Sequence, residues 1–261
     1  MSRTQRKYSS TGCYHIMLRG NEKKDIFLDD HDRFRFLDLI SKKIIDKELV
    51  VYAYCLMNNH VHLVVHDEND QISGTMKGVA TGYAMFFNIK YDRVGHVFQD
   101  RFRSEAVLDD RYLLAVTRYV HNNPVKAGLV DQPDQYRWSS YKDYLSPEGS
   151  EITDPSFVLG LFADNREKAV LYFMEFSRKS DDTEYIDDHR DRMHTLEEGR
   201  TFLENYINGK WPGRESASIL SDKILLREVI RMLGSSTSLS QRKIAALLEV
   251  DRGVVERIMA K

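Results

Sequence analysis

The chain has 261 residues, of which 42% are hydrophobic and 30% are charged. This composition is typical of a globular protein that can bury a sizeable core, and no apolar run is long enough to span a bilayer. The 38 Lys and Arg residues against 40 Asp and Glu residues give a net charge of −2. The chain is therefore not basic throughout, and any surface that binds nucleic acid must be local.

Cysteine content and the N-terminal residues indicate the compartment. The two cysteines, Cys13 and Cys55, are too few for a disulfide framework. The N-terminal run Met-Ser-Arg-Thr-Gln-Arg-Lys lacks the hydrophobic stretch of a secretory signal. We therefore expect a reducing, cytoplasmic location and no membrane partner.

Periodicity in the first 145 residues predicts alternating strands and helices. In chain order we expect a strand over 11–18, a helix that begins near 29 or 30, strands over 49–56 and 60–66, a helix over 71–90, a strand within 96–107 and a helix over 109–122. This β-α-β-β-α-β-α order predicts the α+β class, with an antiparallel sheet and helices on one face, as in ferredoxin-like or RRM-like domains.

The chain changes character after residue 145. Residues 155–177 have helical periodicity, whereas residues 178–200 are rich in charge and are typical of a linker or an exposed helix. The end of the chain is again periodic. We therefore expect three parts: 1–145 with the sheet, 146–214 as a helical and acidic linker region, and 215–261 as an all-helical domain.

The run from Cys55 to Val65 places His60 and His62 two residues apart in an apolar, β-branched segment. Side chains alternate along a strand, so both imidazoles point to the same face and Val61 points to the other. Two imidazoles side by side can bind a divalent metal. The alternative is a strand with two half-buried, hydrogen-bonded histidines, and the spacing alone leaves both open.

A second motif ends the helix expected over 109–122. Tyr119 and Asn123 are four residues apart, so on an α-helix they share a face. Pro124 disfavours helical geometry at Asn123 and is expected to end the helix there. A tyrosine in an amphipathic helix is most often a core or rim residue, so the pair alone does not identify a nucleophile.

Five ordered segments resemble one family. They are Tyr-His-Ile-Met-Leu-Arg-Gly-Asn at 14–21, Ala-Tyr-Cys-Leu-Met-Asn-Asn-His-Val-His-Leu-Val at 53–64, Phe-Gln-Asp-Arg-Phe at 98–102, Arg-Tyr-Val-His-Asn-Asn-Pro-Val-Lys-Ala-Gly-Leu-Val at 118–130 and Trp-Ser-Ser-Tyr at 138–141. Together they are similar to the single-tyrosine transposases of the HUH endonuclease superfamily, which act on single-stranded DNA, and most of all to REP-associated tyrosine transposases. The likeness covers about residues 8–145.

The resemblance implies roles for individual residues. His60, His62 and Asn123 would be metal ligands, with Mg²⁺ or Mn²⁺ as the cofactor, and Tyr119 would be the nucleophile. One residue departs from the family's pattern, because Asn58 stands where a proline is expected before Asn-His-Val-His. The departure alters the turn and leaves the histidine spacing unchanged.

The chemistry of these residue types is consistent with the implied roles. A tyrosine hydroxyl has an ordinary pKa of about 10 and is a poor nucleophile at neutral pH. A divalent ion can withdraw charge from the scissile phosphate and orient it for in-line attack. Imidazole ligands favour Mn²⁺ over Mg²⁺ because they are softer than oxygen. Attack by Tyr119 would give a 5′-phosphotyrosine and a free 3′-hydroxyl, and the covalent link would keep the phosphodiester energy for rejoining.

Further basic and histidine side chains are candidates for contact with DNA or the site. The resemblance places Arg19, Arg101 and Arg103 on a surface that faces single-stranded or hairpin DNA, where they would hold backbone phosphate; ordinary solvated arginine is the alternative. His15 and His66 are also histidines on expected strands, and His66 has the same parity as His60 and His62. Each of the two is either an outer contact of the site or a structural histidine. Relatives of the broader family form dimers, so a homodimer is also compatible with the sequence.

The C-terminal residues predict helices that can bind DNA. Residues 221–233 form an amphipathic pattern, and residues 239–259 resemble a helix-turn-helix in which Glu249 stands where a glycine often makes the turn. Arg252 and Arg257 would then lie on the recognition helix and meet DNA. The alternative is a small helical bundle used only for packing.

Three functions are compatible with these observations. The first, which the resemblance favours, is a metal-dependent transposase that cleaves and rejoins single-stranded DNA near a hairpin, with Tyr119 as nucleophile. The second is a domesticated transposase that regulates by binding a DNA sequence without strand transfer. The third is a metal hydrolase that uses His60 and His62, with Tyr119 in a structural role.

Overall fold

The computed structural model describes residues 8–67, 69–179, 185, 196–211, 222–237, 239 and 241–259. The chain divides into two compact units, Met1–Thr183 and Glu184–Lys261. The segment 146–214, which the sequence predicted as a part of its own, is divided between these two units. None of the described helices combines the length and the apolar character that a membrane span requires.

A four-stranded antiparallel sheet forms the centre of the first unit. Its strands are β1 (Cys13–Arg19), β2 (Val50–Leu56), β3 (His60–His66) and β4 (Arg103–Val107), arranged in the order β2-β3-β1-β4. Every neighbouring pair is antiparallel. The α+β class, the antiparallel sheet and the order of strands and helices predicted from the sequence are therefore confirmed.

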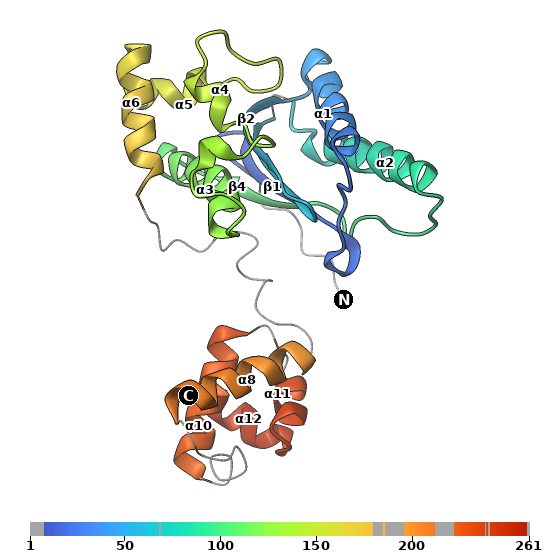
Figure 1. Ribbon diagram of the computed structural model, residues 1–261, viewed down its shortest axis with the longest axis vertical. Coiled ribbons are helices and arrows are strands. Elements are labelled where there is room, and N and C mark those ends of the chain that lie inside the picture. Colours follow the sequence, from blue (N-terminus) through green and yellow to red (C-terminus); the bar gives the residue numbers. More distant parts are fainter. Residues whose placement is uncertain are drawn as a thin grey trace. The chain divides into compact units, whose positions relative to one another are not determined.

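Two helices cover one face of the sheet. These are α1 (Asp30–Ile45) and α2 (Ile72–Lys90), which lie side by side in Figure 1. Alternate strand residues such as Ile16, Leu63 and Val65 point to this side and are fully or almost fully buried with Phe36 and Tyr83. The apolar residues of one strand parity therefore build the main core.

The opposite face is covered as well, by a helix that adds a layer to the helices expected on one face. Helix α3 (Asp110–Lys126) contacts β2, β3 and β4 and lies on the side of the sheet away from α1 (Figure 1). The physical reason lies in the strands, because the strand residues that point to this second face are apolar too. Ala53, Cys55 and Val64 on that parity are completely buried, and such residues need a covering layer.

The turn between β2 and β3 is tied to the loop after β1. The main-chain carbonyl of Asn58 accepts hydrogen bonds from the N–H groups of Ile26 and Phe27, at 2.8 and 3.0 Å, and that of Asn59 accepts one from Gly20 at 2.8 Å. The loop between these donors includes a short 3-10 helix, η1 (Asn21–Lys23). The turn is therefore anchored at both of its central residues.

The rest of the first unit is helical. It comprises a 3-10 helix η2 (Pro133–Gln135) and the helices α4 (Tyr141–Leu145), α5 (Ser156–Gly160) and α6 (Arg166–Ser177). The helical periodicity over 155–177 thus corresponds to two helices, α5 and α6. Asn165 caps the second of them by accepting a hydrogen bond from the N–H of Lys168 at 3.0 Å.

The second unit is all-helical where the structure describes it. Its helices are α8 (Leu196–Lys210), α10 (Lys223–Ser236), α11 (Gln241–Leu247) and α12 (Arg252–Met259). Ile207, Val229, Leu233, Ile244 and Val255 are buried in one core. The connection from α11 to α12 includes Glu249 at φ 54°. This is the left-handed conformation for which glycine is the usual choice.

The first testable consequence concerns Gly20. A Cβ atom there would lie 2.0 Å from the carbonyl oxygen of Lys24 and 2.9 Å from Cγ2 of Ile26. Because the nearest obstacle is backbone, we expect Gly20→Ala to lower the free energy of unfolding by about 1–3 kcal/mol. In the control Gly74→Ala, a new Cβ in helix α2 meets nothing within 4 Å, and we expect a gain of about 0.5–1 kcal/mol. Urea unfolding measures both, and equal behaviour of the two variants would contradict the close approach.

Candidate metal and tyrosine site

The two histidines of the H-x-H motif lie on the face of the sheet that α3 covers. His60 is half-buried and His62 is completely buried. Their ring centroids are 5.0 Å apart. In the strand register His62 pairs with Met17 on one side and with Cys55 on the other, so apolar neighbours surround it within the sheet.

Asn123 of α3 meets both imidazoles. Its Oδ1 lies 3.3 Å from Nε2 of His60, and its Nδ2 lies 3.4 Å from Nε2 of His62. The two Nε2 atoms therefore converge on a single amide group. This is the set of three side chains that the resemblance proposed as metal ligands.

The Nδ1 atom of each imidazole, on the side away from Asn123, has a hydrogen-bond partner. Nδ1 of His60 lies 2.6 Å from Oδ1 of Asn59, and Nδ1 of His62 lies 3.0 Å from Nε2 of His15. A proton on each Nδ1 leaves the lone pair of each Nε2 directed at Asn123, which is the form that binds a metal ion. The residues present therefore fit a divalent cation with two nitrogen donors and one amide oxygen.

The donor set contains no carboxylate. Among the described residues, no three His, Cys, Asp or Glu side chains are grouped so that they could hold a metal ion. Two imidazoles and an amide are all neutral ligands. A bound cation would thus keep most of its positive charge for an anionic ligand such as a phosphate.

Tyr119 lies beside the histidines. Its ring centroid is 5.6 Å from that of His62 and 6.0 Å from that of His15. The residue is only 4% exposed, and Nζ of Lys126 lies 4.5 Å from the ring centroid. The structure thus brings the expected nucleophile and the expected ligands together.

Helix α3 does not end at Asn123, as the proline had predicted, but continues through Pro124 to Lys126. Proline removes one N–H donor and opposes helical geometry in the preceding residue. Here Pro124 is buried, and the N–H groups of Ala127, Gly128 and Leu129 close the helix end. Tyr119, Asn123 and Lys126 consequently share one helix face.

Sequence reasoning missed some neighbours of the site. Lys126 and Asn59 were not singled out, although Lys126 is two turns from Tyr119 and Asn59 adjoins His60. Glu105 is a further neighbour, because its Oε2 lies 3.9 Å from Nδ1 of His15. Of the two further histidines on strands, His15 contacts His62 through its ring, which agrees with an outer role.

The arginines predicted to bind DNA lie in three places. Arg19 pairs with His60 and Arg103 pairs with Met17 in the strand register, so both are on the site's face of the sheet. Arg101 instead lines a groove of about 770 Å³ between α2 and residues 95–102. Arg252 and Arg257 are on α12, in the second unit.

His121 anchors α3 on its other side. Its Nε2 lies 2.8 Å from Oγ of Ser140, and its ring packs against Tyr141, Tyr144 and Phe173. Complete burial lowers the pKa of His121 from its usual 6.5 to about 3. The imidazole is therefore a neutral structural group that helps to hold the helix carrying Tyr119 and Asn123.

The comparison with protein families covers the residues of this site. Residues 8–123 match the family model described as "Transposase IS200 like". The match begins before β1 and ends at Asn123, so it includes the H-x-H motif and Tyr119. Residues 8–123 are therefore similar to the IS200-like transposases, and the resemblance predicted from the sequence is confirmed.

One of the solved structures that the chain resembles is a REP-associated tyrosine transposase bound to a REP hairpin. The sequence identity is 18%, the TM-score is 0.46, and the match covers 60% of this chain and 94% of the other. The comparison with curated proteins gives no significant match.

The burial of His121 predicts a pH dependence of stability. Between about pH 6.5 and pH 3 the unfolded chain binds a proton at this histidine and the folded chain does not, so acidification favours unfolding. We expect this group to lower the free energy of unfolding by about 1.5 kcal/mol between pH 6.5 and pH 5. The variant His121→Gln should reduce that loss, as measured by urea unfolding at the two pH values, whereas His96→Gln in an exposed loop should not. An unchanged pH dependence in His121→Gln would argue against a neutral, buried imidazole.

Proposed function

We propose that the protein is a metal-dependent transposase that cleaves and rejoins single-stranded DNA through a covalent tyrosine intermediate. The observation that carries the proposal is the convergence of two imidazole Nε2 atoms on the amide of Asn123, one helical turn from Tyr119. A site built for a carboxylate-rich metal centre or for a nucleotide cofactor would need other residue types. The match of residues 8–123 to a transposase family supports the same reading.

Each residue has a distinct task in this proposal. His60, His62 and Asn123 would hold Mg²⁺ or Mn²⁺, which when bound supplies positive charge to the non-bridging oxygens of the scissile phosphate. Tyr119 would attack the phosphorus in line, so that its Oη–P bond forms as the P–O3′ bond breaks. The phenol proton is lost, and the departing 3′ oxygen ends as a hydroxyl group. Rejoining reverses these steps with an incoming 3′-hydroxyl.

Basic side chains near the site would hold the DNA strand. Lys126 places an ammonium group beside the ring of Tyr119, where it can attract the phosphate backbone. Arg19 and Arg103 share the sheet face with the histidines and would extend this positive surface. We propose a hairpin-bearing single strand as the substrate, because this is what the family resemblance implies. Arg101 on the groove beside α2 and Arg252 and Arg257 on α12 are proposed as further contacts with the same DNA.

The covalent step can be tested directly. A labelled hairpin oligonucleotide with single-stranded flanks is incubated with the full chain and Mn²⁺ and run on a denaturing gel. We expect a protein–DNA adduct that is lost at least 1,000-fold in Tyr119→Phe, because the nucleophilic oxygen is absent. The control Tyr172→Phe, on an exposed part of α6, should form adduct at the wild-type level.

The other outcomes of this gel distinguish the alternative functions. Binding of the hairpin without any adduct in the wild-type protein would favour a DNA-binding regulator. Cleavage that survives Tyr119→Phe would favour a metal hydrolase in which this tyrosine is structural. Either result would overturn the proposed mechanism.

Metal binding can be tested without DNA. We expect the protein alone to bind Mn²⁺, and His60→Ala to weaken this binding at least 10-fold because one of three donors is lost. Titration calorimetry or Mn²⁺ electron paramagnetic resonance gives the affinity. The exposed loop variant His96→Ala serves as the control and should bind as the wild type does. Equal Mn²⁺ affinity of wild type and His60→Ala would place the cation elsewhere.

A further inference from the structure

A buried arginine lies behind the turn that leads into the H-x-H motif. Arg33 of α1 is 8% exposed. Its guanidinium carbon is 5.4 Å from the ring centroid of Phe27 and 5.4 Å from that of Trp138. A guanidinium group between two aromatic rings has little freedom to move, and its donors point in fixed directions.

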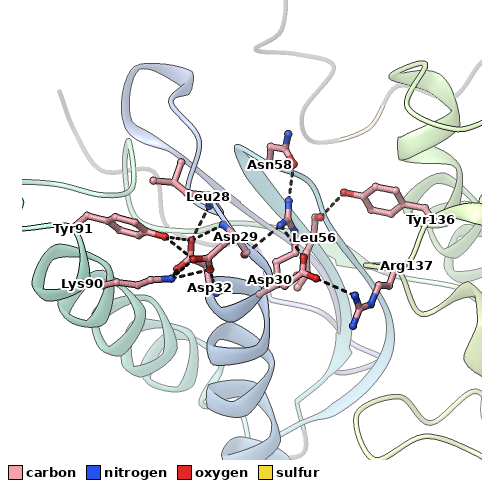
Figure 2. Close-up of polar contacts among 11 residues, drawn as sticks. Leu28, Asp29, Asp30, Asp32, Leu56, Asn58, Lys90, Tyr91, Tyr136 and Arg137 are labelled. Carbon is pink, nitrogen blue, oxygen red and sulfur yellow. Dashed lines mark hydrogen bonds and ion pairs between the residues drawn. The ribbon is translucent and has the colours of Figure 1, made fainter.

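The donors of Arg33 are directed at the turn and at the start of α1. Nη2 donates to Oδ1 of Asn58 at 2.6 Å, and Nη1 donates to the carbonyl oxygen of Asp29 at 3.3 Å. Figure 2 shows Asn58 and the hydrogen bond that its side chain accepts. A hydrogen bond from a charged donor is about twice as strong as one between neutral groups, so the side chain of Asn58 is held firmly.

The start of α1 is itself fixed. The completely buried carboxylate of Asp32 accepts hydrogen bonds from Nζ of Lys90 at 2.7 Å and from the hydroxyl of Tyr91 at 2.8 Å. It also accepts one from the N–H of Leu28 at 2.7 Å. Figure 2 shows this cluster beside the contacts of Asn58. Arg33 therefore projects from a rigid base.

Asn59 connects the restrained residue Asn58 to His60. Asn59, the next residue, accepts from Nδ1 of His60 through its Oδ1 at 2.6 Å and donates through Nδ2 to the carbonyl oxygen of Lys23 at 3.1 Å. The orientation of the His60 ring, and so the direction of its Nε2 toward Asn123, depends on where Asn59 sits.

We propose that Arg33, acting through the side chain of Asn58, is a positioning residue for the metal ligand His60. The proposal rests on the proposed function, in which His60 binds the cation. Asn58 stands where the family's pattern has proline, a residue that stiffens a turn by fixing its own φ angle. Asparagine lacks that restraint, and the hydrogen bond from Arg33 supplies one in its place. Neither Arg33 nor Asn58 touches the reacting atoms.

The experiment measures Mn²⁺ affinity in the DNA-free full chain. We expect Asn58→Ala to weaken Mn²⁺ binding about 10-fold, the lower end of the effect of removing an outer hydrogen bond. Because Asn58 is exposed, the melting temperature of the Asn58→Ala variant should stay within about 3 °C of that of the wild type. Asn58→Asp keeps an oxygen acceptor for Arg33 and should bind Mn²⁺ within about twofold of the wild type. The control Asn69→Ala removes a side chain that donates to the carbonyl oxygen of Lys47 in a different loop, and should have no effect.

A double-mutant cycle checks that Arg33 is the partner. In an Arg33→Met background the further change Asn58→Ala should cost less than about twofold in Mn²⁺ affinity, since the interaction is already lost. Wild-type affinity in Asn58→Ala together with weak binding in His60→Ala would overturn the positioning role and leave the proposed function standing. Wild-type affinity in His60→Ala would overturn both.

Discussion

The packing of α3 against the histidine face of the sheet is the interaction on which the rest of this structure depends. The sheet supplies His60 and His62, whereas the helix supplies Asn123 and Tyr119, and neither layer holds a complete site. Apolar side chains drive the contact, because Val116 and Val120 of α3 are completely buried. The polar residues of the site are thus brought together by the burial of their apolar neighbours.

Neighbouring side chains restrict the direction of each histidine that we propose as a metal ligand. His60 is oriented by Asn59, and His62 by His15, in both cases through Nδ1. Further contacts lie behind these residues: Arg33 donates a hydrogen bond to Asn58, and Glu105 lies near His15. In the proposed function, such outer contacts would fix the geometry before a cation or a DNA strand binds and so would lower the ordering cost of binding.

Much of the fold and of the site could be predicted from the sequence. Strand parity placed His60 and His62 on one face, and a four-residue spacing placed Tyr119 and Asn123 on one side of a helix. The differences have identifiable causes. Pro124 was expected to end α3, but burial and the closing hydrogen bonds outweigh its local preference. Helices were expected on one face, and α3 covers the second face as well, where Ala53, Cys55 and Val64 are completely buried.

The sequence by itself determined the residue types, their spacing and the face on which each lies, because strand and helix periods are local properties of the backbone. It also predicted, through an ordered set of motifs, the transposase family that residues 8–123 match. Only the tertiary structure decided that Lys126 lies over the ring of Tyr119, that His15 supports His62 and that Arg33 reaches Asn58. These contacts join residues from different elements, and their geometry follows from how whole layers pack, which no local pattern encodes.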